Sequence, residues 1–193
     1  MTSSPLAVRL RETVRELTVV DQAVYAAVAA TPTPTLDTWL RELSTAANHS
    51  KISFSIAALL AVRPGAARRA AAAGVAAVTV ASVSANLLGK QLARRPRPDR
   101  DAAQVPFVRH VPMPVSASFP SGHTASAFAF ATAVGTCLPW TSVPLGLLAA
   151  TVGYSRVHTG VHYPGDVAAG ALLGMASAAA VTGLARPLLH PPV

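Results

Sequence analysis

The sequence contains few charged and few aromatic residues for its length. Of its 193 residues, only 12% are charged and 5% aromatic, whereas 51% are hydrophobic. Because soluble domains carry about twice this charged fraction, the composition favours a membrane protein over an unusually apolar soluble helical bundle. The formal net charge is +8, but the basic residues form no long patch interleaved with aromatics, so nucleic acid is not an expected partner. We expect the basic residues to contact lipid headgroups or an anionic substrate.

Cysteine is also scarce. The single Cys137 lies in an apolar run and cannot form an internal disulfide, and no Cys/His spacing typical of a zinc site occurs. The segment from Met1 to Leu17 contains arginines and glutamates and lacks the apolar core of a signal peptide. Membrane insertion is therefore expected through internal segments.

The hydrophobic residues form segments punctuated by proline, glycine and arginine, without the alternation typical of strands. We predict an all-α fold, an integral-membrane helical bundle of about five or six helices. The first helix mixes charged and apolar residues and is expected to lie in the membrane interface or on the bundle. The expected helices cover residues 11–30, 37–62, 66–92, 124–138, 142–157 and 165–185.

Residues 1–193 are expected to form a single membrane domain. Its parts are an N-terminal interfacial or accessory helical region, 1–48, and a core bundle, 49–187, with polar motifs at 90–98, 120–123 and 155–166. Between the first two motifs, proline recurs too often for a continuous helix, so a long ordered loop rich in proline and arginine is predicted.

Three polar clusters interrupt the apolar sequence. Charged groups beside hydrophobic helices are costly and usually functional. In an antiparallel bundle the helix ends next to these clusters face the same side, so the clusters should converge in space. They are Lys90 with Arg97-Pro98, the tetrapeptide Pro120-Ser121-Gly122-His123, and Ser155-Arg156 followed by His162 and Asp166.

Five of these residues are suited to holding a phosphate group. Lys90 supplies a point charge, and Arg97 and Arg156 supply planar guanidinium groups that can bind two oxygens each. Ser121 and Gly122 precede a predicted helix, whose N-terminal amides favour an anion. Phosphoryl transfer depends mainly on such positioning and fixed positive charge.

The two histidines fit the remaining catalytic roles. His162 and Asp166 are four residues apart and share a face if the chain is helical there, so the carboxylate could orient a nucleophilic imidazole. His123 could protonate the leaving oxygen and then activate water. A set of structural ion pairs is the alternative explanation for these clusters.

The spacings resemble the three motifs of the type 2 phosphatidic acid phosphatase family, within the vanadium haloperoxidase-like superfamily. The family motifs Lys-x6-Arg-Pro, Pro-Ser-Gly-His and Ser-Arg-x5-His-x3-Asp are matched without substitution between Lys90 and Asp166. The resemblance implies a phosphohistidine at His162, oriented by Asp166, a general acid at His123, and no metal or other cofactor. It also implies that the phosphate is bound by Lys90, Arg97, Ser121, Gly122 and Arg156.

The resemblance predicts a metal-independent membrane phosphatase of bacterial type. Its substrate would be a lipid phosphate or diphosphate, such as a polyprenyl phosphate or diphosphate, phosphatidic acid or phosphatidylglycerol phosphate; the sequence does not choose among them. The alternatives are a vanadate-dependent haloperoxidase-like enzyme, a soluble acid phosphatase of the same superfamily, and a non-catalytic lipid-binding membrane protein.

Placement in the cell membrane follows from the same resemblance, which implies an extracytoplasmic active site. Arg63, Arg68 and Arg69 lie at the opposite ends of the helices, where the positive-inside rule favours the cytoplasm. Gly170 and Gly174 allow close helix packing, which is expected inside the bundle and is weaker support for a homodimer.

Some charged residues near the motifs have simpler expected roles. Arg95-Pro96 imitates the first motif but is two residues too close to Lys90, so phosphate contact is not its main expectation. Asp21 lies in the apolar first helix and is expected to pair with an arginine, and His158 is expected to be a structural or exposed histidine.

Overall fold

The computed structural model describes residues 5–89 and 94–184, and this part of the chain is helical, without a strand. The expected all-α bundle is confirmed. Its described residues contain seven α-helices, α1 (Pro5–Ala30), α2 (Pro34–Ala46), α3 (Lys51–Ala61), α4 (Ala66–Val83), α6 (Gly122–Cys137), α7 (Ser142–His158) and α8 (Pro164–Leu184).

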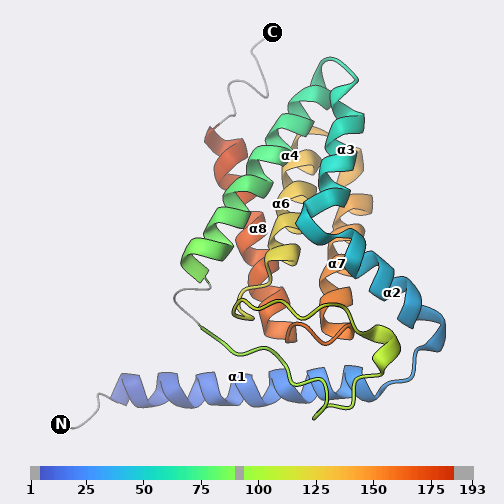
Figure 1. Ribbon diagram of the computed structural model, residues 1–193. Helices are drawn as coiled ribbons and strands as arrows, with labels where there is room; N and C mark the ends of the chain where they lie inside the picture. The colour runs from blue at the N-terminus through green and yellow to red at the C-terminus, as the bar shows by residue number, and fades with distance from the viewer. Residues whose placement is uncertain (1–4, 90–93, 185–193) are drawn as a thin grey trace.

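Helices α3, α4, α6, α7 and α8 stand alongside one another as the bundle, and α1 lies across one end of it (Figure 1). Helix α6 is central and packs against α4, α7 and α8. Consecutive bundle helices run in opposite directions, so α6 and α8 begin, and α7 ends, at the end that α1 crosses.

Small residues allow α6 and α8 to pack at very short distance. A Cβ atom added to Gly174 would lie 2.3 Å from the carbonyl oxygen of Ala125, and one added to Gly170 would lie 2.5 Å from that of Ser121. The glycine pair therefore packs within the chain, as favoured from the sequence. Alanines fill the adjoining core, namely Ala73, Ala77, Ala81, Ala125, Ala129, Ala133 and Ala178.

The single helix expected over 37–62 is wrong, because the chain breaks between α2 and α3. A short 3-10 turn, Asn48–Ser50, separates them, and His49 and Ser50 both have φ of 56°. Left-handed backbone at residues other than glycine is uncommon and interrupts a right-handed helix. Helix α2 starts with Pro34 after Thr33, so Asp37 lies inside its first turn and is not its N-cap.

The predicted long loop without a continuous helix is confirmed over its described part, residues 94–121, which contain one 3-10 turn, Phe107–Arg109. Arg109 anchors this loop to α1 and α2. Its guanidinium is buried and donates to Asp37 Oδ1 at 2.9 Å, and His158 Nε2 lies 3.1 Å from the same oxygen. Arg109 also donates to backbone oxygens of Val28, Ala29 and Thr31.

Two helices in the described residues, Ala66–Leu87 and Pro164–Leu184, have the length and composition that a bilayer crossing requires. Both run along the bundle axis (Figure 1). The first extends α4 through a π-helical turn, Ser84–Gly89. Lys90 follows that turn and lies outside the described residues, so its role stays a prediction.

Candidate active site

The described members of the three polar clusters meet at the end of the bundle that α1 crosses. Arg97 Nη1 lies 3.2 Å from His162 Nε2. The backbone N–H of His162 donates to the carbonyl of Arg156 at 3.2 Å, and that of Ser121 donates to the carbonyl of Asp166 at 2.9 Å. Residues from the loop, α6, α7 and α8 thus share one site, as the helix directions predicted.

His162 lies at the centre of this site and is 2% exposed. Its Nδ1 is 3.5 Å from Asp166 Oδ2 and 3.4 Å from Ser118 Oγ, whereas its Nε2 faces the Arg97 guanidinium. Because a guanidinium only donates hydrogen bonds, Nε2 must accept and Nδ1 must carry the ring proton. This tautomer directs the lone pair of Nε2 toward the cationic side of the site, as a nucleophile requires.

Burial lowers the pKa of His162 to about 4. The hydrogen bond to Asp166 raises the pKa, whereas the positive charges of Arg97 and Arg156 lower it further. Desolvation disfavours the charged imidazolium, and here it outweighs the carboxylate. The imidazole is therefore neutral at physiological pH.

Asp166 is fully buried, and both of its carboxylate oxygens are occupied. Oδ2 accepts hydrogen bonds from Ser118 Oγ and from the Tyr163 N–H, the latter at 2.9 Å. Oδ1 accepts from Arg95 Nη1 at 3.0 Å. Sequence reasoning missed Ser118, for which the loop sequence carries no signal. It noted Arg95 only as an imitation of the first motif.

Two guanidinium groups lie beside His162 without a carboxylate ion pair in the described part of the chain. Arg156 is 2% exposed, its Nη1 donates to Ser44 Oγ at 2.6 Å, and its Nε has no hydrogen-bond partner there. Among the residues that the structure describes, Arg97 bonds to His162 and otherwise only to neutral oxygens of Ser116, Ala117 and Val161. Buried cations are normally paired, so this excess positive charge is suited to an anion.

The N-terminus of α6 contributes backbone donors to the same region. The helix begins at Gly122 after Ser121, and the amides of its first turn lack intrahelical acceptors. A Cβ atom added to Gly122 would meet nothing within 4 Å, so space is open there. The buried Ser121 hydroxyl accepts a hydrogen bond from Thr124 Oγ1, which leaves its own proton to donate.

His123 is held by a residue that sequence reasoning also missed. Its Nε2 lies 2.8 Å from Asn48 Oδ1, in the turn between α2 and α3. Since an amide oxygen accepts, Nε2 carries a proton in this contact. The left-handed residues after Asn48 turn the chain from α2 into α3 at this point, and no sequence pattern indicated it.

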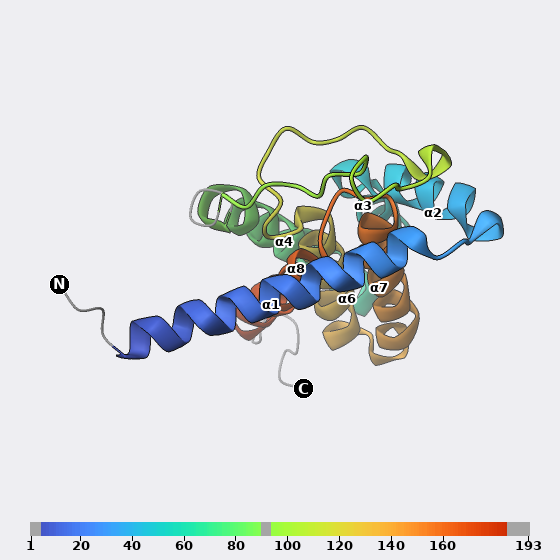
Figure 2. The same ribbon diagram turned by 90° about the horizontal axis from the view of Figure 1, so that it is seen from below.

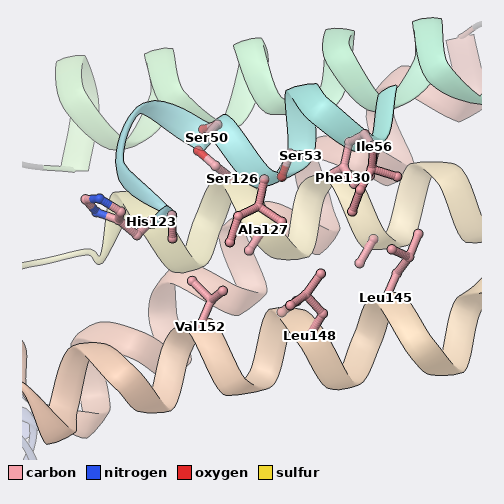
Figure 3. A pocket seen from close by; sticks show the side chains of 14 residues that line it. Ser50, Ser53, Ile56, His123, Ser126, Ala127, Phe130, Leu145, Leu148 and Val152 are labelled. Atoms are coloured by element: carbon pink, nitrogen blue, oxygen red, sulfur yellow. The ribbon is translucent and has the colours of Figure 1, made fainter. Parts of the chain in front are cut away.

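His123 also marks the mouth of an apolar groove between α3, α6 and α7 (Figure 3). The groove is narrow, with a cavity volume of about 20 Å³, room for about one water molecule, and it ends among Ile56, Phe130 and Leu145. A more polar hollow of about 180 Å³ adjoins it and shares Ser50, His123 and Ser126. Its other lining residues are His49, Ser82, Asn86 and Gly122. A polar hollow leading into an apolar groove fits an amphiphilic ligand.

Among the described residues, no three His, Cys, Asp or Glu side chains gather as metal ligands would. The titratable groups of the site pair instead with arginine, serine and asparagine.

In a comparison with known protein families, residues 70–187 match the sequence model of the PAP2 superfamily. Over 89 residues the chain is 43% identical to decaprenylphosphoryl-5-phosphoribose phosphatase of Mycobacterium tuberculosis, a match covering 46% of each protein. The chain thus spans about half the length of this curated relative.

Two solved structures share the fold. Aquifex aeolicus LpxE is 25% identical with a TM-score of 0.68, over 85% of this chain and 95% of that one. A transmembrane PAP2 type phosphatidylglycerolphosphate phosphatase from Bacillus subtilis is 22% identical with a TM-score of 0.71, over 90% of this chain and 88% of that one.

Proposed function

This chain belongs to the PAP2 superfamily, and on that premise we propose that it is a membrane lipid phosphatase that hydrolyses a phosphate monoester or diphosphate. The observation that carries the proposal is the pair of guanidinium groups, Arg97 and Arg156, beside a neutral, buried His162; within residues 5–89 and 94–184 neither has a carboxylate partner. Together they match what phosphoryl transfer needs, a nucleophile and fixed charge for the equatorial oxygens.

In the proposed reaction, Nε2 of His162 attacks phosphorus and the bond from phosphorus to the leaving oxygen breaks. His123, which must enter this step as the imidazolium because its Nε2 proton is held by Asn48, gives a proton to that oxygen and becomes neutral. Water then attacks the phosphohistidine, His123 takes a proton from it, and the bond from phosphorus to His162 breaks. Asp166 holds Nδ1–H of His162 throughout.

We assign phosphate binding to Arg97, Arg156, Ser121 and Gly122, with Lys90 as a further ligand by its place in the motif. The phosphate would lie between the Arg97 guanidinium and the start of α6, within reach of Nε2 of His162. The hydrocarbon chain would extend through the polar hollow into the apolar groove, whose walls would have to move apart to admit it. The Mycobacterium relative is named for a decaprenyl-linked phosphoribose. This name supports the polyprenyl-linked phosphates among the candidate substrates, beside phosphatidic acid and phosphatidylglycerol phosphate.

The protein would be integral to the cell membrane with its active site outside the cytoplasm. Two helices suit a bilayer crossing, and the exposed Arg63 and Arg68 lie at the far end from the site. Cytoplasmic ends of membrane helices are enriched in such basic residues.

Purified protein in detergent, assayed for phosphate release from a panel of lipid monophosphates and diphosphates, tests the function. His162→Asn should lower kcat by more than about 10³-fold, because it removes the nucleophile. His110→Asn, a histidine outside the site, is the matched control and should keep normal activity. Vanadate should inhibit and chelators should not.

Robust turnover by His162→Asn would exclude the proposed nucleophile. Vanadate-dependent bromide oxidation without phosphate release would favour a haloperoxidase-like enzyme instead.

A further inference from the structure

Helix α1 crosses the active-site end of the bundle but contacts it only in part. It packs against α7 and α8, and the remainder extends past the bundle (Figures 1 and 2). The two helices of membrane-spanning length run along the bundle, transverse to α1 (Figure 1). A helix in this orientation, at the end of membrane-spanning helices, lies in the plane of the bilayer surface.

One face of α1 is continuous from the docked part to the overhanging part. Its residues are spaced three or four apart, so they lie in one row along the helix. In the docked half, Tyr25 is 4% exposed and its ring packs edge-on against Tyr163, with ring centroids 5.4 Å apart. In the overhanging half, Val14 and Leu17 are 55% and 63% exposed. The row consists of Val14, Leu17, Asp21, Tyr25 and Val28.

Three charged residues of the overhanging half lie on the opposite side of the helix, and Arg15 lies on the flank, about 100° around the helix from Val14. Arg9, Glu12 and Glu16 are exposed and are spaced three and four apart. In the overhanging half the row therefore presents the apolar side chains of Val14 and Leu17. They face the side on which the spanning helices would contact lipid. This is the pattern of an amphipathic helix at a bilayer surface. The partner that fits the overhanging face is a lipid surface.

Asp21 lies in the middle of this row and connects α1 to the catalytic carboxylate. Its Oδ2 is 2.6 Å from Arg95 Nη2, and Arg95 Nη1 is 3.0 Å from Asp166 Oδ1. Its Oδ1 accepts a hydrogen bond from the N–H of Gly165, the residue before Asp166, at 2.6 Å. The Arg95 guanidinium also lies 4.1 Å from the centre of the Tyr163 ring, so it is held on two sides.

We propose that α1 is an in-plane membrane anchor that couples the lipid surface to catalysis. When the apolar row of α1 is inserted in the bilayer, Asp21 holds the Arg95 guanidinium against Oδ1 of Asp166. The other oxygen of Asp166, Oδ2, is then fixed in its contacts with Ser118 and with Nδ1 of His162. Asp21 and Arg95 are positioning residues, since they reach His162 only through Asp166. The catalytic half of this inference rests on the function proposed above.

The test uses the full chain in nanodiscs of phosphatidylcholine and phosphatidylglycerol, with water-soluble p-nitrophenyl phosphate as substrate. Asp21→Asn removes the negative charge that faces Arg95, and Val14→Glu weakens insertion of the apolar row into the bilayer. Each should lower kcat about 10-fold by misplacing the nucleophile, with KM within about twofold. The double variant should lose no more than the larger single effect, because both changes act through one contact.

Matched controls carry the same kinds of substitution on the other side of α1. Val19 lies about 140° around the helix from Val14, and Val19→Glu should keep wild-type kcat. Glu16→Gln likewise removes an exposed charge without touching the bundle and should have no effect.

A second measurement reads the membrane contact without activity. Spin labels are placed at Val14→Cys and Val19→Cys in a Cys137→Ala background. The label at position 14 should be accessible mainly to molecular oxygen dissolved in the bilayer, and the label at position 19 mainly to a water-soluble nickel complex. Equal aqueous accessibility at both positions would overturn the membrane anchor. An active wild type with unchanged kcat in Asp21→Asn would overturn the coupling, whereas a wild type without His162-dependent activity would remove the proposed function and the catalytic half with it.

Discussion

The ionisation of His162 is determined by neighbours with opposing effects. Burial and the positive charges of Arg97 and Arg156 disfavour the imidazolium, and the hydrogen bond to Asp166 favours it. Motif spacing predicted roles for His162, Asp166 and Arg97. The structure places their side chains next to one another, and their catalytic roles stay predictions. Spacing could not identify Ser118 or Asn48, because each reaches the site from a segment whose local sequence carries no pattern.

The lowered pKa of His162 predicts a specific dependence of stability on pH. The unfolded histidine titrates near 6.5 and the folded one near 4, so between these values the unfolded chain binds a proton that the folded protein does not. The free energy of unfolding is therefore undiminished above pH 6.5 and falls as the pH is lowered toward 4, because the unfolded chain gains this proton first. Between pH 7 and pH 5 the decrease is about 2 kcal/mol.

Thermal unfolding in detergent at pH 7 and pH 5 measures this effect. Tm of the wild type should fall by roughly 5 °C more than Tm of His162→Asn, which lacks the titrating group. The exposed His49→Asn is the control and should fall as much as the wild type. Equal pH sensitivity of wild type and His162→Asn would contradict the buried neutral imidazole.

Among the helices, the break between α2 and α3 has the largest consequence for the site. It places Asn48 on His123 and starts α3 along the apolar groove. Hydrophobic periodicity located the helices on both sides of the break, but two consecutive left-handed residues without glycine carry no sequence signature. The break was therefore decided by packing.

Filling the groove should distinguish lipid substrates from soluble ones. Ala127 on α6 lines the groove beyond His123, so Ala127→Phe would occupy the space assigned to the hydrocarbon chain (Figure 3). We expect kcat/KM for a lipid phosphate to fall about 10-fold or more, a typical effect of blocking part of an apolar pocket. Activity on p-nitrophenyl phosphate should change less than twofold by the same reasoning.

The matched control is Ala150→Phe, an exposed position on α7 that does not line the groove. Ala150→Phe should keep the wild-type kcat/KM with both substrates. Ala127→Phe should keep it with p-nitrophenyl phosphate and lose it with the lipid phosphate. Equal loss on lipid and soluble substrates would place the hydrocarbon chain elsewhere.

Over the whole molecule, charge and aromatic residues differ between the two ends of the bundle. The active-site end holds the arginine-rich loop and α1. The opposite end holds Arg63, in the turn between α3 and α4, and Arg68, in the first turn of α4. Trp140 is 72% exposed in the turn before α7, at the end away from the site, where an interfacial aromatic is expected.

Cysteine labelling in intact cells tests the proposed orientation. In a Cys137→Ala background, Val115→Cys should react with a membrane-impermeant maleimide, because Val115 is fully exposed on the loop at the active-site end. Val62→Cys, 74% exposed at the far end, should react only after permeabilisation. The reverse pattern would place the active site in the cytoplasm.

The sequence by itself determined the helical class, the three polar motifs and the end of the bundle where their described residues meet. These properties follow from local periodicity, from spacing and from the alternating direction of consecutive helices. Only the tertiary structure decided which groups surround His162. Arg95 was predicted as a minor candidate for phosphate, yet it holds Asp166, because Asp21 approaches from a helix 74 positions earlier in the chain (95 − 21). Such contacts depend on how whole helices pack, which no local pattern encodes.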